Sequence, residues 1–196
     1  MRIGVLALQG AFIEHEKILH ALGAEVVQVR LPAQLNGLDG LIIPGGDSTT
    51  IGKLAVQFGL IEPLREFVQN KPTWGTCAGM IFLANQLEHN QQPILGAMDI
   101  TVDRNAFGRQ IDSFEADLRI TGLDEPFHAV FIRAPVATAT SGDARVLSQL
   151  EDGRIVAAQQ GHLLATAFHP ELTDDTRLHQ YFLDLIAEHA TGETSS

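Results

Sequence analysis

The pattern of hydrophobic and polar positions predicts strands and helices in alternation over the first half of the chain. Residues 2–8 (RIGVLAL) form a continuous apolar run, which is typical of a strand buried on both faces. Apolar residues then recur at helical spacing up to a glycine, so we expect a helix over 11–22. The same alternation predicts strands at 25–29, 38–44 and 72–74, and helices at 49–58, 61–69 and 78–87.

Strands and helices that alternate through short links form a doubly wound α/β fold. The sheet is then mostly parallel, with helices on both faces. The second half of the chain has a different pattern, with short strands separated by turn residues. We expect these strands at 99–104, 115–120, 128–136, 144–150, 154–160 and 162–168. They suggest a partly antiparallel extension on the same core.

The end of the chain combines a helix with a polar tail. Apolar residues at helical spacing predict an amphipathic helix over 175–189. The small polar residues that follow predict a disordered tail at 191–196. Neither an internal repeat nor a linker interrupts the pattern, so we expect one domain over 1–190.

Composition and charge narrow the classes of function. The net charge of −11 argues against nucleic acid and anionic membranes as partners, because both carry negative charge. The apolar start of the chain runs into the charged residues EHEK, so we read it as neither a signal peptide nor a membrane span. One cysteine cannot form an internal disulfide, which favours a reducing, cytoplasmic setting.

The single cysteine lies in a distinctive motif, G-T-C-A-G at 75–79. This is the nucleophile-elbow pattern, with Cys77 in place of serine, between an expected strand and an expected helix. Side chains at positions 75 and 79 would collide with neighbouring backbone, so glycines are needed there. The turn would point the sulfur outward at the carboxyl end of the sheet, where open α/β sheets bind ligands. A small buried cysteine in a glycine-rich turn is the alternative.

A thiol is mostly protonated at neutral pH, so a nucleophilic cysteine needs a base. Of the eight histidines, we expect five in polar helical stretches to be solvated: His15, His20, His89, His179 and His189. Two more, His128 and His162, are uninformative. His169 differs because it ends an apolar strand and enters H-P-E, where Glu171 could orient its imidazole. A capped turn before the last helix explains H-P-E equally well.

The motif PGGDSTT at 44–50 follows the third expected strand. Its spacing does not fit a P-loop, so we reject nucleotide binding through it. We expect an oxyanion hole made by one N–H of this loop and the N–H of Ala78. An ordinary turn with a helix cap is the alternative.

Together these motifs resemble the class I, triad-type glutamine amidotransferases. The chain is similar in particular to the glutaminase subunits of the two-protein pyridoxal 5′-phosphate synthases. That likeness extends over IGVLALQGAF–EH, LIIPGGDSTTIGKL, the elbow, VDRNAFGRQIDSFEADL, FIRAP and FHPEL, nearly the whole chain. It implies a flavodoxin-like fold of the class I amidotransferase type.

The resemblance implies hydrolysis of L-glutamine to L-glutamate and ammonia. Cys77 is then the nucleophile, His169 the base and later the acid, and Glu171 the residue that orients it. The N–H groups of Gly46 and Ala78 form the oxyanion hole. Glutamine contacts carried over by motif position are Gly46, Asp47, Ser48, Arg104, Ile132 and Arg133.

One position departs from the family pattern. The family usually has glutamate where this chain has Asp47, whose side chain is one methylene shorter. The two arginines suit the substrate independently of the resemblance, because a guanidinium matches a carboxylate with a fork of donors. Ordinary surface ion pairs are the alternative for both arginines.

One cysteine and scattered histidines lack the spacing of metal ligands, so we expect no metal site. The resemblance also implies a partner and no cofactor. The partner is a (β/α)8-barrel synthase subunit that consumes the ammonia, in a complex of up to twelve copies of each subunit. The family's glutaminases are poorly active alone, and an oxyanion-hole N–H that turns inward only on docking would explain this. Alternatives are the glutaminase of another amidotransferase, a non-catalytic regulatory module of the same fold, and a cysteine peptidase of related fold.

Overall fold

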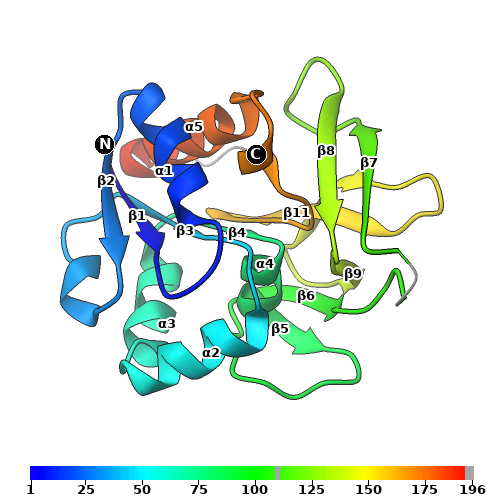
Figure 1. Cartoon of the computed structure of the whole chain (residues 1–196). Helices are drawn as coiled ribbons and strands as arrows, with labels where there is room; N and C mark the ends of the chain where they lie inside the picture. Colours follow the sequence, from blue (N-terminus) through cyan, green and yellow to red (C-terminus); the bar gives the residue numbers. More distant parts are fainter. Residues whose placement is uncertain (109–110, 193–196) are drawn as a thin grey trace.

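The computed structural model describes residues 1–108 and 111–192, and its centre is one large mixed sheet (Figure 1). The strand order is β2-β1-β3-β4-β12-β11-β9-β6-β5, with β10 paired to β11. Five neighbouring strands run parallel: β2 (Glu25–Val29), β1 (Arg2–Leu6), β3 (Gly40–Ile43), β4 (Thr73–Thr76) and β12 (Leu163–Thr166). The predicted doubly wound, mostly parallel α/β fold is therefore confirmed.

Helices cover both faces of the parallel strands. One face carries α1 (Phe12–Ala21) and α5 (Arg177–Thr191) (Figure 1). The other carries α2 (Ser48–Gln57), α3 (Ile61–Asn70) and α4 (Ala78–Leu83). Every residue of β3, β4 and β12 is buried, because a strand covered on both faces has no solvent side.

The rest of the sheet is mostly antiparallel. It comprises β11 (Ile155–Gln160), β9 (Val136–Thr140), β6 (Met98–Asp103), β5 (Ala84–Leu87) and β10 (Arg145–Gln149). Only β5 and β6 pair in parallel within this group. A separate antiparallel ribbon joins β7 (Ser113–Leu118) and β8 (Phe127–Ile132); in β8 every second residue is buried, whereas in β7 only Leu118 is. The predicted antiparallel extension is present, but β12 belongs to the parallel part.

Two predicted elements each divide into two in the structure. The helix expected over 78–87 ends at Leu83, and 84–87 form β5, because pairing with β6 outweighs the local preference of these residues. The strand expected over 128–136 breaks at Arg133, whose φ of 45° cannot belong to a strand. Two short 3-10 helices, η1 (Pro32–Leu35) and η2 (Pro170–Leu172), were not predicted.

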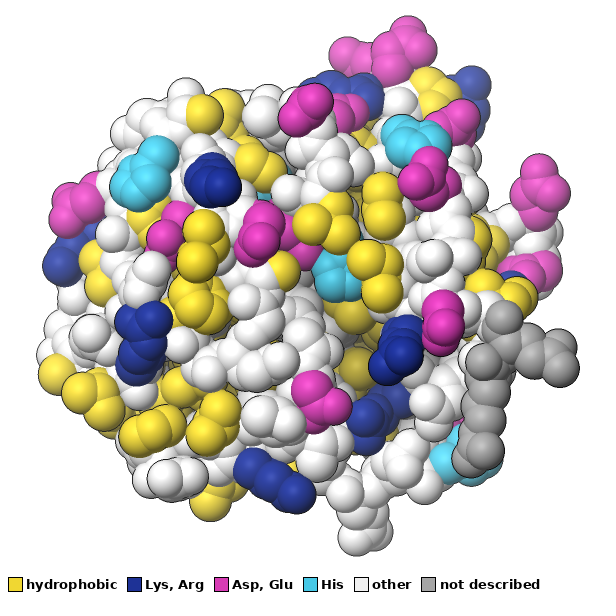
Figure 2. Space-filling model, viewed as in Figure 1, with side chains coloured by type: hydrophobic (Ala, Val, Ile, Leu, Met, Phe, Trp, Pro, Cys, Tyr) yellow, Lys and Arg dark blue, Asp and Glu magenta, His cyan; other side chains and the backbone are white. Residues whose placement is uncertain are grey.

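The last helix begins and ends two residues later than expected, at Arg177 and Thr191. Residues 193–196 of the predicted tail lie outside the described residues. Among the helices of the described chain, none is long and apolar enough to cross a membrane. On the face shown in Figure 2, acidic and basic side chains are interspersed, and a histidine lies between groups of hydrophobic side chains near the middle.

Candidate active site

The G-T-C-A-G motif forms the predicted elbow between a strand and a helix. Strand β4 ends at Thr76, helix α4 begins at Ala78, and Cys77 lies between them with φ 51° and ψ −106°. Positive φ is strained for a side chain other than glycine and is often found at functional sites. The chain therefore turns sharply at the cysteine.

The two glycines of the motif allow this turn because backbone passes close to both. A Cβ added at Gly75 would lie 2.4 Å from the carbonyl carbon of Gly79. A Cβ at Gly79 would lie 1.9 Å from the carbonyl oxygen of Ile43 on β3. Neither obstacle is a flexible side chain, so the predicted reason for both glycines is confirmed.

His169 reaches the elbow because β12 lies beside β4 in the sheet. The two strands run parallel with Thr166 opposite Thr76, and the N–H of Cys77 donates to the carbonyl of Thr166 at 2.8 Å. Parallel strands end at the same edge of a sheet, so the residues after Thr166 continue beside the elbow. The N–H of His169 is held by the carbonyl of Val130 on β8 at 2.8 Å.

Glu171 contacts the imidazole of His169, as the H-P-E spacing predicts. The 3-10 turn that begins at Pro170 brings the Glu171 carboxylate back, and its Oε1 lies 2.6 Å from His169 Nδ1. Nδ1 therefore carries a proton, and Nε2 is free for the thiol of Cys77. Burial opposes the charged imidazole, but hydrogen bonds to Cys77 and Glu171 outweigh it and raise the pKa of His169 to about 10.

These three side chains are more enclosed than the sequence suggested. Cys77 is 6% exposed, His169 8% and Glu171 6%. The sulfur was expected to point outward; the thiol lies at the predicted edge of the sheet, but Cys77 is buried there. The end of strand β8 lies close by, with the Ile132 carbonyl oxygen 3.9 Å from the sulfur.

The arrangement can support nucleophilic chemistry. A charged imidazole beside a thiol favours the thiolate, and the thiolate is the reactive form of cysteine. Enclosure strengthens the electrostatic interactions among the three groups because little water screens them. The catalytic roles of Cys77, His169 and Glu171 stay predictions, now with the geometry that such roles need.

The glycine pair after β3 lies against this group. A Cβ at Gly45 would lie 2.5 Å from His169 Cε1, so the loop packs directly on the imidazole. Gly46 precedes Asp47, the N-cap residue of α2, and Ala78 is the first residue of α4. N–H groups at helix starts lack intrahelical acceptors. The oxyanion hole of Gly46 and Ala78 remains a prediction.

Asp47 is a helix cap in this structure. Its carboxylate accepts a hydrogen bond from the N–H of Thr50 at 2.7 Å, as in the alternative interpretation of the motif. That bond keeps the pKa of Asp47 below its ordinary value. The backbone N–H of Asp47 donates to the side chain of Gln9 at 2.8 Å. The Asp47 carboxylate is thus engaged in capping α2, and a substrate contact at this position stays a prediction.

Ser48 and Arg104 meet at a residue that the sequence did not single out. Gln92 Oε1 accepts from Arg104 Nη1 at 2.6 Å and from the hydroxyl of Ser48 at 3.3 Å. Arg104 also donates to the hydroxyl of Thr49 at 3.2 Å. The guanidinium is thus held against the start of α2. Gln92 lies in an irregular segment with no motif, so no pattern could have indicated it.

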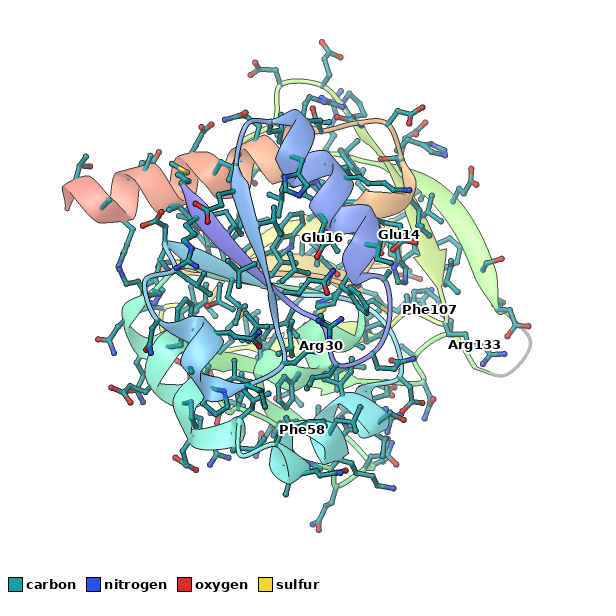
Figure 3. All side chains as sticks on the ribbon, turned by 60° about the vertical axis from the view of Figure 1, so that its left-hand side comes forward. Glu14, Glu16, Arg30, Phe58, Phe107 and Arg133 are labelled. Carbon is teal, nitrogen blue, oxygen red and sulfur yellow. The ribbon has the colours of Figure 1, made fainter. Side chains whose placement is uncertain are left out.

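Arg133 lies beside a cavity of about 490 Å³, which Arg104 and Phe107 also line. The side chain of Arg133 is exposed, forms a weak ion pair with Asp112 at 3.4 Å, and lies near Phe107 at the edge of the molecule (Figure 3). Ile132, the residue before Arg133 in the chain, has its carbonyl oxygen 3.9 Å from the sulfur of Cys77. Two predicted substrate contacts therefore share one hollow, and their roles stay predictions.

The prediction that five histidines are solvated is wrong for two of them. His20, His89 and His189 are exposed, but His15 and His179 are completely buried. Their positions could have indicated this, because His15 falls on the apolar stripe of α1 with Phe12 and Leu19. In the described part of the chain, no three His, Cys, Asp or Glu side chains are grouped as a metal site.

The fold and the site define an α/β protein with a cysteine–histidine–glutamate group at the edge of its sheet. The chain belongs to the SNO glutamine amidotransferase family, whose model matches residues 5–188. The resemblance inferred from the motifs is therefore confirmed. A solved structure described as a glutamine amidotransferase is 49% identical, with a TM-score of 0.89 over 94% of this chain and 98% of that one.

Two curated relatives carry a more specific name, pyridoxal 5′-phosphate synthase subunit PdxT. The relative from Herpetosiphon aurantiacus is 60% identical over 190 residues, 94% of this chain and all of its own. The relative from Deinococcus radiodurans is 58% identical over 97% of this chain and all of its own. A putative GMP synthase subunit from Thermoplasma acidophilum, at 17% identity and a TM-score of 0.69, shares the fold.

Proposed function

We propose that the protein hydrolyses L-glutamine to L-glutamate and ammonia and supplies the ammonia for pyridoxal 5′-phosphate (vitamin B6) biosynthesis. The observation that carries this proposal is the short contact between His169 and Glu171 beside the only cysteine, on its strained elbow. The SNO family match and the PdxT names of relatives near 60% identity support the substrate and the pathway.

The first half of the reaction is attack by sulfur on the amide carbon. The thiolate of Cys77 bonds to that carbon, and the N–H groups of Gly46 and Ala78 stabilise the negative oxygen that forms. His169 then gives its proton to the nitrogen, the carbon–nitrogen bond breaks, and ammonia leaves. The product is a thioester between the glutamyl group and the sulfur.

The second half is hydrolysis of the thioester. His169, now neutral, removes a proton from a water molecule that attacks the same carbon. The carbon–sulfur bond breaks, glutamate leaves and the thiolate is restored. Throughout, Glu171 holds the imidazole by Nδ1 so that Nε2 faces the reacting atoms. No cofactor or metal is required.

The partner follows from the fate of ammonia. We place residues 1–190 in one glutaminase domain in the cytoplasm, and the relatives' name, a subunit of pyridoxal 5′-phosphate synthase, supports a second subunit that consumes the ammonia. The partner in our proposal is a synthase subunit built as a (β/α)8 barrel, in a complex of up to twelve copies of each chain. Arg104 and Arg133 bind the substrate carboxylate, with Asp47, Ser48 and Ile132 lining the remainder of the glutamine site.

The test is ammonia release from glutamine, with and without the synthase subunit, for wild type and Cys77→Ala. We expect release by wild type, strong stimulation by the synthase, and loss of about four orders of magnitude or more in the variant. Formation of pyridoxal 5′-phosphate in the same mixture distinguishes this protein from the glutaminase of another pathway.

Three results would contradict the proposal. Equal turnover by Cys77→Ala would point to a non-catalytic module, and peptide cleavage without glutamine turnover would point to a peptidase. Full turnover without the synthase would overturn the gating that we expect from an oxyanion-hole N–H that turns inward only on docking.

A further inference from the structure

Two buried histidines lie behind the site, and the reaction proposed above does not use them. His15 on α1 and His179 on α5 are both completely enclosed. His15 Nδ1 lies 2.8 Å from His179 Nε2, and His15 Nε2 lies 3.5 Å from Glu171 Oε2. A chain of contacts therefore runs from α5 through α1 to the carboxylate that holds His169.

The second oxygen of Glu171 has no other anchor. Its Oε1 is taken by His169, whereas Oε2 is buried and makes no hydrogen bond of good geometry within the described residues. A buried carboxylate oxygen without a donor is costly. The titratable groups that face this carboxylate are His169 on its own turn and His15 from α1, with His179 from α5 behind His15.

The contacts decide where the protons of the two histidines lie. His179 Nδ1 is buried and has no partner in the described part of the chain, so a bare nitrogen costs less there than an N–H. Its proton then lies on Nε2 and is donated to His15 Nδ1. That leaves the proton of His15 on Nε2, which faces Glu171 Oε2 and the hydroxyl of Thr76 at 3.3 Å.

The opposite assignment costs more at both ends, although the Thr76 hydroxyl could then donate to His15 Nε2. A proton on His15 Nδ1 would leave an unpaired N–H on His179 in the interior. It would also direct the lone pair of His15 Nε2 at a carboxylate oxygen, where two acceptors repel each other. Burial lowers the pKa of both rings, to about 4 for His179, so each is neutral and carries one proton.

We propose that His15 is a positioning residue of this site. Its Nε2–H faces Oε2 of Glu171 at 3.5 Å and the hydroxyl of Thr76 at 3.3 Å, and His179 holds His15 in the tautomer that directs an N–H rather than a lone pair at the carboxylate. Glu171 thereby faces an N–H group at both oxygens, that of His169 in a hydrogen bond at Oε1 and that of His15 in a longer contact at Oε2. The catalytic effect of this inference rests on the proposed function, and the tautomers can be measured without it.

The surroundings suit a rigid support. The indole of Trp74 packs edge-on against both rings, with centroids 5.9 Å from His15 and 4.9 Å from His179. His15 also contacts Thr76, the residue before the nucleophile. Helix α1 is therefore connected to both ends of the reacting group, the elbow and the Glu171 turn.

The matched variants are His15→Leu, which removes the donor, and His15→Gln, whose amide N–H can replace Nε2–H. His162→Leu is the control. His162 is also partly buried and lies 4.8 Å from a second histidine ring, His189, but it sits at the opposite end of β12 from His169. Thermal unfolding of each variant reports whether the fold is intact.

The first readout needs no substrate. Cys77 is the only cysteine, so the rate of its alkylation by iodoacetamide against pH reports the thiolate. An N–H directed at a carboxylate favours its ionised form, and the ionised Glu171 in turn favours the charged imidazole that stabilises the thiolate. We therefore expect the acid limb of the alkylation rate profile to move to higher pH in His15→Leu, and to stay at the wild-type position in His15→Gln and His162→Leu.

The second readout is glutamine turnover with the synthase present. We expect kcat to fall about 10-fold to 100-fold in His15→Leu with little change in KM, and to recover largely in His15→Gln. The third is nitrogen-15 NMR of the imidazoles, which should show both His15 and His179 protonated at Nε2.

Distinct results separate this inference from the proposed function. An alkylation profile of His15→Leu equal to wild type, or a proton on His15 Nδ1, would overturn the inference and leave the glutaminase proposal standing. Absence of glutamine turnover by the wild-type complex would overturn the glutaminase proposal, while alkylation and NMR would still judge the role of His15.

Discussion

Trp74 Nε1 donates a hydrogen bond of 3.0 Å to Thr166 Oγ1, across 92 residues of sequence. Trp74 lies on β4 shortly before Cys77, and Thr166 ends β12 shortly before His169. Both side chains are completely buried, so no water can replace either partner. This bond joins the two strands whose ends carry the thiol and the imidazole.

We expect this bond to contribute measurably to stability. Trp74→Phe and Thr166→Val should each lower the free energy of unfolding by about 1–3 kcal/mol, because each leaves a buried partner unpaired or a gap. The double variant should lose less than the sum, with a coupling of about 0.5–3 kcal/mol. Urea unfolding of the four proteins measures this, and strictly additive losses would contradict it.

Replacing Gly79 by alanine should destabilise the protein, although helix propensity alone would favour alanine at this position. Gly79 lies inside α4, where alanine is ordinarily favoured over glycine by about 1 kcal/mol. A Cβ there would meet the Ile43 carbonyl at 1.9 Å. We therefore expect Gly79→Ala to lower the free energy of unfolding by about 2–4 kcal/mol.

Gly23→Ala is the matched control for that substitution. Gly23 has φ 85° and nothing within 4 Å of an added Cβ, so alanine there meets backbone strain alone, about 1 kcal/mol. Chemical denaturation of both variants separates a steric clash from backbone strain. A loss in Gly79→Ala no larger than in Gly23→Ala would show that α4 can shift away from β3.

His179 predicts how stability depends on pH. Burial lowers the pKa of His179 from 6.5 to about 4. Between these values the unfolded chain binds a proton at this position and the folded chain does not, so stability falls as pH falls. This histidine alone should lower the free energy of unfolding by about 3 kcal/mol between pH 7 and pH 4.

The measurement is urea unfolding at pH 7 and pH 4.5. The difference between the two pH values should be smaller in His179→Gln than in wild type. His20→Gln, on the exposed side of α1, should keep the wild-type difference. An unchanged difference in His179→Gln would mean that the buried ring gains a proton without cost.

The two arginines beside the cavity predict substrate affinity. Arg104→Ala or Arg133→Ala should raise KM for glutamine about 10-fold to 100-fold, since a charged hydrogen bond to the substrate carboxylate is lost. kcat should change less, because neither guanidinium touches the thiol or the imidazole. Steady-state kinetics of the complex with the synthase measures both constants.

Arg2→Ala is the control for these arginines. Arg2 also forms an ion pair on the surface, with Glu25, but it lies at the start of β1, away from the cavity. Its KM should equal that of wild type. Unchanged KM values in the Arg104 and Arg133 variants would favour the alternative that both are surface ion pairs.

The sequence predicted most of the fold because its signals are local. Buried runs such as LII in β3 and the stripe of α1 recur at the spacing of one element, and glycine marks their ends. The errors arose where distant pairing dominates. Residues 84–87 form a strand because β6 lies beside them and pairs with them. Likewise, β12 belongs to the parallel strands because it pairs with β4.

The residues of the candidate site likewise fall into two groups, those that a local motif indicates and those that only the tertiary structure reveals. G-T-C-A-G and H-P-E are short motifs whose geometry follows from a turn, so Cys77, His169 and Glu171 could be named in advance. Gln92 belongs to no motif, and His15 lies in the IGVLALQGAF–EH segment, which gives no sign of its contact with Glu171; packing alone brings them to these places. The enclosure of the sulfur likewise depends on the end of β8, a separate ribbon.

By itself, the sequence determined the alternation of strands and helices, the strained turn at Cys77 and the pairing of His169 with a carboxylate two residues away. Each of these depends on neighbours within a few positions. Only the tertiary structure decided that β4 and β12 are adjacent, that Asp47 caps a helix and that two histidines are buried behind Glu171. Those outcomes depend on which distant surfaces exclude water from one another, and spacing along the chain does not encode that.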